Sequence, residues 1–315
     1  MVSVLFWASS CSKEAGQSPT LPRQDLPEYT AHVESSDVGS RTTLNSAYDI
    51  LWAAGDQIAV FNKTSVASLY QLEEGAGTKQ GKFKSPTSSQ TSASEEAVSG
   101  AVLSHNGAIY PYAQGATMTE AGEHFVFEGL KLPATQYYIE NTLPAARDNS
   151  SVGCLPMIAV SSSHALQFKN IGAAIKLQLK SGDVENHRLA SIILTARTAD
   201  DKGESTLPLA GQLSVKVDKE GQNPTITIAS ETSNAIELKI PNVTLSKSQA
   251  TNFYIAVPPV TFPHGFQLVV KDNYGHEMIL KSQKATTLNR NALLIMPQIA
   301  YKAGTWGSID DIIIQ

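Results

Sequence analysis

The chain has 315 residues, enough for two domains of ordinary size that each bury a core without help from metals or disulfides. Its formal charge of −5 is spread thinly, with neither the basic stripe that a phosphate backbone requires nor an acidic block, so we expect no nucleic-acid partner. Charged residues make up only 17% of the chain, which favours strands and polar turns over solvent-exposed helices.

The N-terminal segment resembles a bacterial secretion signal that ends in a lipidation motif. A short apolar run, residues 2–7, is followed by Ala8, Ser9, Ser10 and Cys11. The run is far shorter than the roughly 20 residues of a membrane span, so we expect it to be removed and Cys11 to carry a lipid. No Lys or Arg precedes the run, which suggests that the true start lies further upstream. The alternative is a frayed N-terminus with an incidental cysteine.

A polar tether and a first strand follow the lipidation motif. Residues 11–27 are rich in Ser, Pro, Gln and Gly, so we assign residues 1–28 to the signal and a tether. Tyr29, Ala31 and Val33 then alternate with polar residues, which predicts a short strand. A polar stretch from residue 34 to residue 41 separates this strand from the next apolar segment, and we expect an exposed loop there.

Period-2 alternation predicts further strands, and tight turns join several of them into hairpins. The clearest alternating segments are residues 175–179, 213–217, 226–228, 266–270 and 278–280. The second and third of these form a hairpin across residues 218–221, and the last two form another across residues 272–275. Asn106 and Gly107 supply a positive-φ pair for a third tight turn before Ile109. Three hairpins indicate antiparallel sheets.

The predicted strands indicate an all-β fold of two tandem antiparallel β-sandwiches. No window of ten or more residues has an apolar stripe at helical spacing, and prolines recur throughout the chain. An antiparallel sheet buries one face, so two sheets must stack, and two such sandwiches account for the length. We place their boundary at the serine run of residues 161–163. The N-terminal sandwich then spans residues 29–163 and the C-terminal sandwich residues 164–315.

The sequence lacks the residue patterns of catalytic and metal sites. The histidines are scattered, with no H-E-x-x-H or C-x-x-C pattern, and Cys154 stands apart from them, so we expect a buried, inert thiol there. The glycines of residues 75–82 lack the spacing of a phosphate-binding loop, and Phe83 stands where Ser or Thr is needed. No G-x-S-x-G elbow occurs, and the acidic doublets place successive carboxylates on opposite faces of an extended chain. We therefore expect no enzyme, no metal and no cofactor.

The segment Leu-Trp-Ala-Ala-Gly-Asp-Gln-Ile-Ala-Val-Phe, residues 51–61, resembles the W-x-x-G-D-x-I-x-V-F signature of the fimbrillin family. We expect Trp52 to cap a core, Gly55 and Asp56 to turn the chain, and Ile58 and Val60 to point together into a sheet. Further matches follow in the order of the family and are residues 110–112, 132–136, 156–157, 168–174, 253–259 and 265–275. Together they span most of residues 40–300.

The resemblance implies a pair of transthyretin-like, Greek-key sandwiches that are exported as a lipoprotein to the outer membrane and assemble into a type V pilus, or fimbrium, on the cell surface. In that family a trypsin-like, arginine-specific protease cuts the loop after the first strand, which leaves, and a partner's strand fills the groove. Carried onto this chain, the resemblance implies that the departing strand is that of Tyr29, Ala31 and Val33. It implies cleavage at Arg41, with Arg23 as the alternative, and an uncleaved, solvated arginine is the other interpretation.

The C-terminal run of residues 309–315 is the candidate donor strand, with Ile309, Ile312, Ile313 and Ile314 as its apolar residues. Alternatively, the run is the last strand of the second sandwich and closes that sandwich's own edge, which fits a tip or accessory subunit. The implied partners are other pilus subunits, the arginine-specific protease and a host or bacterial surface receptor. The membrane is reached only through the lipid anchor.

A surface lipoprotein that binds glycans is the alternative function. All-β lipoproteins of this size often hold sugars on aromatic platforms, and Tyr137, Tyr138 and Trp306 are the candidate platform. Trp306 and Trp52 also lie beside strand patterns, which favours core or sheet-edge positions for both.

Overall fold

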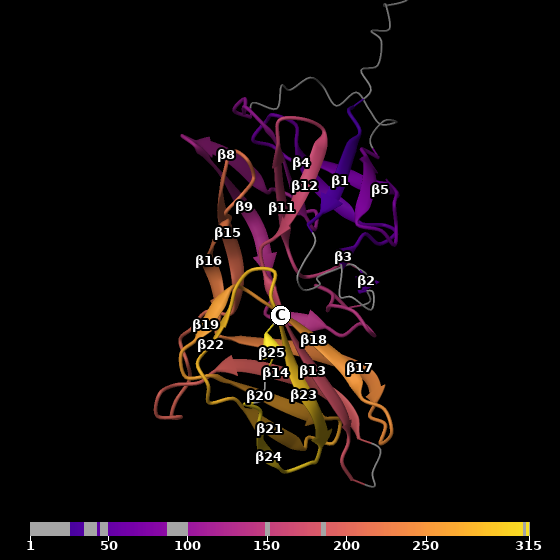
Figure 1. Cartoon of the computed structure of the whole chain (residues 1–315), viewed down its shortest axis with the longest axis vertical. Coiled ribbons are helices and arrows are strands. Elements are labelled where there is room, and N and C mark those ends of the chain that lie inside the picture. Colours follow the sequence, from indigo (N-terminus) through magenta and orange to yellow (C-terminus); the bar gives the residue numbers. More distant parts are fainter. Residues whose placement is uncertain are drawn as a thin grey trace, which may run out of the picture.

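The computed structural model of the chain describes residues 26–34, 43–44, 50–86, 100–148, 152–183, 187–310 and 313–314. These residues form strands, turns and loops, and no helix among them is long and apolar enough to cross a membrane. The all-β prediction is confirmed. The molecule is elongated, with a barrel at one end, two packed sheets at the other, and a further sheet along one side (Figure 1).

Seven strands close into the barrel, in the order β1-β12-β11-β7-β4-β5-β6 around the ring. Their bounds are β1 Tyr29–Val33, β4 Gln57–Phe61, β5 Ser68–Glu74, β6 Gln80–Lys84, β7 Asn106–Tyr110, β11 Met157–Ser161 and β12 Ala165–Asn170. The sequence predicts a sandwich of two sheets for this part of the chain, but the structure has a closed ring. The ring closes because β1 pairs with β6 on one side and with β12 on the other. The apolar cluster inside the ring, the barrel core, includes Trp52, Tyr110 and Phe168.

Two sheets face each other at the opposite end. The six-stranded sheet has the order β10-β17-β14-β20-β21-β24, and the C-terminal sheet has the order β18-β13-β23-β25. The bounds of the first are β10 Thr135–Tyr137, β14 Arg188–Ala196, β17 Ala235–Thr244, β20 Phe266–Asp272, β21 Glu277–Lys281 and β24 Trp306–Ser308. Those of the second are β13 Ala173–Ser181, β18 Thr251–Val257, β23 Leu293–Tyr301 and β25 Ile313–Ile314. Ile175, Leu177 and Leu179 of β13 are fully buried in the apolar cluster between the sheets, as predicted.

A bridging sheet with the order β16-β15-β9-β8 joins the two ends. Its strands are β8 Thr117–Ala121, β9 His124–Leu132, β15 Ala210–Asp218 and β16 Thr225–Ser233. It covers a third apolar cluster, the shared core, which takes Phe127 and Val215 from this sheet, Phe61 from the barrel and Tyr254 from the C-terminal sheet. Two short pairs complete the fold, β2 Thr43–Leu44 with β3 Ile50–Leu51 and β19 Val260–Phe262 with β22 Thr286–Leu288.

Strand β4 explains the apolar run at the end of the signature. Ile58 and Val60 point into the barrel core, as predicted, whereas Ala59 and Phe61 belong to the shared core. Successive side chains of a strand point to opposite faces. Because both faces of β4 are covered, its apolar residues are consecutive and do not alternate with polar ones.

Two of the three predicted hairpins are confirmed and the third is wrong. Strand β15 pairs with β16 through Leu213 and Ile228, and β20 pairs with β21 through Leu268 and Leu280. Residues 106–107 lie inside β7 and do not form a turn. Position 107 requires glycine for another reason, because a Cβ there would collide with the side chain of Met118.

The predicted boundary between residues 163 and 164 falls between β11 and β12, which are neighbours in the barrel. The serine run before the boundary makes a compact hairpin loop, in which the backbone N–H of Ser163 donates to Oγ of Ser161 at 3.1 Å. Short hydroxyl side chains support tight turns as readily as they support linkers. A serine run can therefore mark a hairpin within one sheet.

Candidate functional site

Strand β1 closes the barrel and is the element that the resemblance designates as the departing strand. It runs antiparallel to β6, with Ala31 opposite Gly81, and parallel to β12, with Val33 opposite Phe168. Tyr29, Ala31 and Val33 are fully buried in the barrel core, which confirms the predicted alternation. Without β1 the ring would lie open between β6 and β12, with the ladder edges of both strands unpaired.

The indole of Trp52 holds the middle of β1 from inside the barrel. Its Nε1 donates a hydrogen bond to the carbonyl oxygen of Ala31 at 3.3 Å, and its ring lies edge-on to Phe83 and Phe168. The predicted turn after it is present, with Asp56 Oδ2 accepting from the backbone N–H of Ala53 at 2.7 Å. Trp52 thus contacts both the strand that would leave and the walls that would remain.

Acidic residues flank β1 and meet basic residues of the barrel wall. Glu28 precedes the strand, with its carboxylate oxygens 2.8 Å from Nζ of Lys82 and 2.8 Å from Nζ of Lys84, both on β6. The hydrogen bonds from these two lysines hold the pKa of Glu28 below its usual range. Because its side chain is 45% exposed, solvent screens this pair, and it contributes little to stability.

Glu34, directly after β1, has a more enclosed set of partners. Its Oε1 accepts from Nη1 of Arg290 at 2.7 Å and from the backbone N–H of Asn170 at 2.7 Å, and its Oε2 accepts from Nη2 of Arg290 at 3.3 Å. Nζ of Lys169 lies 3.5 Å from Oε2. The Glu34 side chain is only 11% exposed. Arg290 lies between β22 and β23, so this ion pair joins the end of β1 to the far part of the chain.

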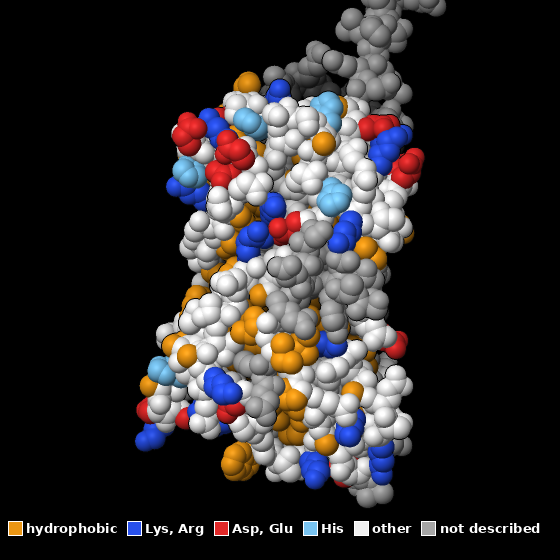
Figure 2. Space-filling view, in the orientation of Figure 1, with side chains coloured by type: hydrophobic (Ala, Val, Ile, Leu, Met, Phe, Trp, Pro, Cys, Tyr) orange, Lys and Arg blue, Asp and Glu red, His pale blue; other side chains and the backbone are white. Residues whose placement is uncertain are grey.

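The C-terminal segment is buried at its beginning and exposed at its end. Ile309 is 2% exposed and belongs to the cluster between the packed sheets, and Oδ1 of Asp310 accepts from the backbone N–H of Gln283 at 2.7 Å. Ile313 and Ile314 pair with β23 at the edge of the C-terminal sheet but remain 60% and 46% exposed. Hydrophobic side chains gather over this half of the molecule (Figure 2), where Figure 1 places β23 and β25. The candidate donor strand is therefore docked by its first residue and only loosely by its last ones.

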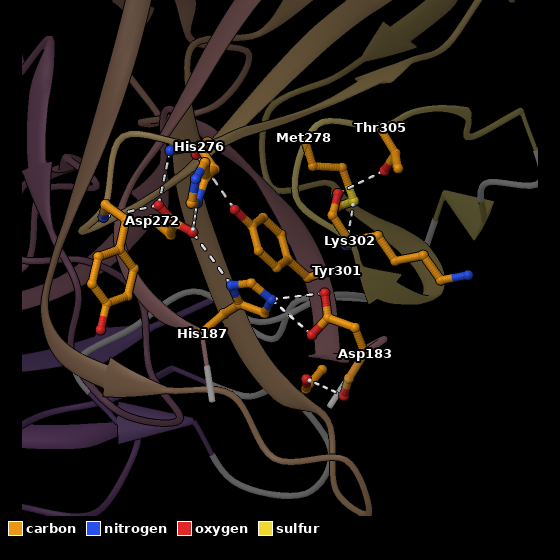
Figure 3. Close-up of polar contacts among 10 residues, drawn as sticks. Asp183, His187, Asp272, His276, Met278, Tyr301, Lys302 and Thr305 are labelled. Carbon is orange, nitrogen blue, oxygen red and sulfur yellow. Dashed lines mark hydrogen bonds and ion pairs between the residues drawn. The ribbon is translucent and has the colours of Figure 1, made fainter. Parts of the chain in front are cut away.

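A polar network centred on the buried Asp272 and His187 lies at one end of the packed sheets (Figure 3). The carboxylate of Asp272 is fully buried, and its Oδ2 lies 3.0 Å from Nδ1 of His276 and 3.3 Å from Nδ1 of His187. Nε2 of His187 lies 2.7 Å from Asp183 Oδ1. Both ring nitrogens of His187 therefore face carboxylates, and each can donate to one of them when the ring is protonated. The hydroxyl of Tyr301 donates to the carbonyl oxygen of His276 at 3.4 Å.

Burial and hydrogen bonding shift the pKa values in this network in opposite directions. Burial acts to raise the pKa of Asp272, but hydrogen bonds from His276, Tyr274 and His187 outweigh burial and hold this pKa below its usual value. Burial acts to lower the pKa of His187, and the bonds to Asp183 and Asp272 reverse this and raise it. Both shifts favour the charged forms, and the hydrogen bonds tie the start of β14 to the β20–β21 hairpin.

The three aromatic residues proposed as a glycan platform do not come together. Tyr137 on β10 and Trp306 on β24 occupy opposite edges of the six-stranded sheet. The ring of Tyr138 packs on Phe253 with 5.2 Å between centroids, and burial, with Glu140 nearby, raises its pKa to about 12. Trp306 is 80% exposed, whereas Tyr137 lines a shallow hollow of about 370 Å³. A glycan could meet Tyr137 or Trp306, but not both in one site.

Several predicted site residues lie outside the residues that the structure describes. These are Cys11, Arg23, Arg41 and Ile312. Cys154 is buried, as expected. Glu34, Arg290 and Lys169 are not among the residues that the sequence predicts for the site. The signal available for Glu34 was its place directly after the alternating strand, but nothing in the sequence brings Arg290, 256 positions away, to that carboxylate.

No protein-family profile and no curated protein matches the chain. It is similar to a solved structure of a candidate cell adhesion protein from Bacteroides ovatus, with 12% identity over 93% of this chain and 96% of that one and a TM-score of 0.47. A candidate cell adhesion protein from Bacteroides uniformis has 10% identity over 91% and 95% of the two chains and a TM-score of 0.43. The fimbrial anchor protein Mfa2 from Porphyromonas gingivalis has 8% identity over 91% and 96% and a TM-score of 0.33. Likeness at this level carries no conclusion about function.

Proposed function

We propose that the protein is a cell-surface fimbrial subunit or a pilus-associated adhesin, that it is assembled by proteolysis-triggered strand exchange, and that it is not an enzyme. In this proposal it is a variant of the tandem transthyretin-like sandwich, exported as a lipoprotein and anchored in the outer membrane through Cys11. The signature at residues 51–61 and the ordered matches that follow it support the proposal. An arginine-specific protease, other pilus subunits and a surface receptor are the proposed partners.

The observation that carries the proposal is the position of β1 as the strand that closes the barrel. It is a five-residue element bounded on one side by the stretch with Arg41, and its three inward side chains fill the barrel core. A strand that pairs on both edges can be replaced by another extended segment with the same alternation, because the main-chain hydrogen bonds do not depend on sequence. Cleavage at Arg41 would leave β1 attached to the barrel by non-covalent contacts alone.

The energetics favour replacement of β1 over a vacant groove. Burial of a side chain such as Tyr29 or Val33 contributes about 1.5–3 kcal/mol, and an empty position also leaves a cavity and unpaired backbone groups. An opened barrel would therefore be unstable alone, and the strand of a partner would restore what β1 supplied. Such a junction is expected to dissociate slowly.

The proposal is tested by cleaving the mature protein with an arginine-specific protease. We expect the parent protein to form oligomers resistant to mild heating in detergent, visible by size-exclusion chromatography and electron microscopy. Arg41→Ala is expected to abolish these oligomers, whereas the matched variant Arg23→Ala leaves them intact.

Three outcomes identify the part that fails. Oligomers that form equally from Arg41→Ala place the cut elsewhere and contradict Arg41 as the processing site. Oligomers that persist after deletion of residues 309–315 rule out that segment as the donor strand. No oligomer under any condition contradicts a polymerising role.

Glycan binding remains the second candidate function, and the hollow beside Tyr137 favours it. Lys239 and Asn242 line that hollow and offer hydrogen-bonding groups to sugar hydroxyls. Titration calorimetry against host and dietary glycans, with Tyr137→Ala, Tyr138→Ala and Trp306→Ala compared, distinguishes the two functions. Binding that is lost in one aromatic variant supports a glycan-binding lipoprotein.

A further inference from the structure

The two faces of β1 meet different surroundings. Tyr29, Ala31 and Val33 point into the barrel core, whereas Thr30 is exposed and His32 is partly exposed on the outer face. Glu34 continues the outer set and comes directly after the last inward residue. The inner face selects a replacement strand chiefly by size and apolar character, because its surroundings are mostly apolar and aromatic side chains. The exception is the Tyr29 hydroxyl, which donates to Oδ1 of Asn62 at 3.1 Å.

The position of Glu34 can select a replacement strand by the charge of its side chain. Its carboxylate accepts two hydrogen bonds from the guanidinium of Arg290 and one from the backbone N–H of Asn170, with the Lys169 ammonium 3.5 Å away. A guanidinium paired with both oxygens of a carboxylate fixes geometry as well as charge. Four donors thus converge on one anionic group at the end of the groove.

Departure of β1 removes this carboxylate and leaves its cations behind. Arg290 keeps one bond, from Nη1 to the carbonyl oxygen of Asn170 at 3.1 Å. Among the described residues, no carboxylate other than that of Glu34 forms an ion pair with Arg290 or Lys169. With Glu34 in place the two side chains are 31% and 20% exposed, so the neighbouring chain already excludes much of the water around them. An open groove would therefore end in two neighbouring positive charges, a state that favours an incoming anion.

We propose that the segment which replaces β1 is recognised by an acidic residue at the Glu34 position, directly after three alternating apolar residues. The partner of this groove is thus an extended peptide of the pattern apolar-x-apolar-x-apolar-acidic, with its carboxylate bound by Arg290 and Lys169. This inference rests on the proposed strand exchange. It goes further by assigning Arg290, Lys169 and the N–H of Asn170 as the elements that read the sequence of the incoming strand.

Glu28 provides a matched comparison at the other end of the strand. It also pairs with two cations, Lys82 and Lys84, but the Glu28 side chain is 45% exposed, against 11% for Glu34. Exposed ion pairs are screened by water and salt, whereas enclosed ones with several hydrogen bonds are screened much less. The same substitution at the two ends should therefore have unequal effects.

The experiment uses the full chain with the site of a sequence-specific protease inserted between Asp37 and Val38. After cleavage β1 is held only by non-covalent contacts, and a fluorescent peptide of residues 26–34 is added in excess. Its uptake is measured by anisotropy, and unlabelled peptides then compete at equilibrium. The competitors are the parent peptide, its Glu34→Gln form and its Glu28→Gln form, each also tested on a chain with Arg290→Gln.

We expect Glu34→Gln to weaken competition about 10- to 100-fold and Glu28→Gln less than about fivefold. On the Arg290→Gln chain the loss caused by Glu34→Gln should shrink to a few-fold, because the guanidinium that reads the charge is gone. Thermal unfolding of the uncleaved Arg290→Gln chain shows whether that variant is folded. If it is not, Lys169→Gln serves in the same design.

The outcomes separate this inference from the function on which it rests. Exchange of the labelled peptide with equal competition by the Glu34→Gln form overturns the recognition of an acidic residue and leaves strand exchange standing. Absence of exchange by every peptide, after prolonged incubation of the cleaved chain, overturns strand exchange and the inference with it.

Discussion

At the scale of single residues, the carboxylate of Asp272 is a charge enclosed by the protein on every side. It is fully buried and faces both His187 and His276. Asp272→Asn removes the charge that both histidines face, but His187 keeps its bond to Asp183 and His276 is 57% exposed. We therefore expect the substitution to lower the free energy of unfolding by about 1–3 kcal/mol. Glu277→Gln is the control, since Glu277 pairs with Lys271 while 44% exposed and should cost less than about 1 kcal/mol. Urea denaturation measures both.

The cost of Asp272→Asn should also depend on pH. The pKa of Asp272 lies below its usual value of 3.8, so its contribution is present above about pH 3.8 and is lost as the pH falls towards the folded-state pKa. The pKa of His187 lies above its usual value of 6.5, so its contribution is present below about pH 6.5 and is lost as the pH rises through the raised pKa. The difference between parent and variant is therefore largest between these values. A difference that is constant from pH 3 to pH 9 contradicts this account.

At the scale of elements, the sequence predicts well where the strands lie and poorly which strands pair with one another. The alternation of Tyr29, Ala31 and Val33 identifies β1, and side-chain period alone identifies β15 and β16. It does not show that β1 lies parallel to β12, because strands far apart in sequence pair through backbone groups that are the same in every residue. The Asn106–Gly107 error has a similar origin, since a glycine required for close approach to Met118 looks the same as one required for a turn.

In the candidate site, too, some features follow from the local sequence and others depend on the tertiary fold. The apolar face of β1 follows from the local sequence, and the turn at Gly55 and Asp56 follows from turn chemistry. The contact between Glu34 and Arg290 depends on how the barrel sits against the C-terminal sheet, which local periodicity does not encode. Charged residues at the ends of predicted strands are therefore places where function can be present but invisible in the sequence.

The C-terminal segment provides a prediction at this scale, because its two ends are held so differently. Ile309 fills a core position at 2% exposure, so Ile309→Ala should cost about 2–5 kcal/mol of stability. Ile313 is 60% exposed on a two-residue strand, so Ile313→Ala should change stability by less than about 0.5 kcal/mol. Thermal or urea denaturation compares them. Equal losses would mean that β25 is docked as firmly as Ile309, which would argue against its availability as a donor.

At the scale of the whole molecule, the bridging sheet decides whether the two ends behave as separate domains. Strand β9 comes from the N-terminal half of the sequence and pairs with β15 from the C-terminal half. The shared core likewise joins Phe61 of the barrel to Tyr254 of the C-terminal sheet. Independent domains would each bury a core of their own with few contacts between them. Here a third core belongs to both ends, which favours coupled unfolding.

Coupling predicts that the described strands unfold in one calorimetric transition. A cavity in the shared core should then lower the midpoint temperature of that whole transition. Phe127 is fully buried there, with its ring centroid 5.9 Å from that of Phe61, so Phe127→Ala should cost about 3–5 kcal/mol. Val102→Ala, at a side chain 89% exposed, is the control and should leave the transition in place. Two transitions in the parent protein, only one of them shifted by Phe127→Ala, would show that the ends are independent. The removal of β1 could then be confined to the barrel, whereas a single transition means that opening the barrel also weakens the packed sheets and the segment docked through Ile309.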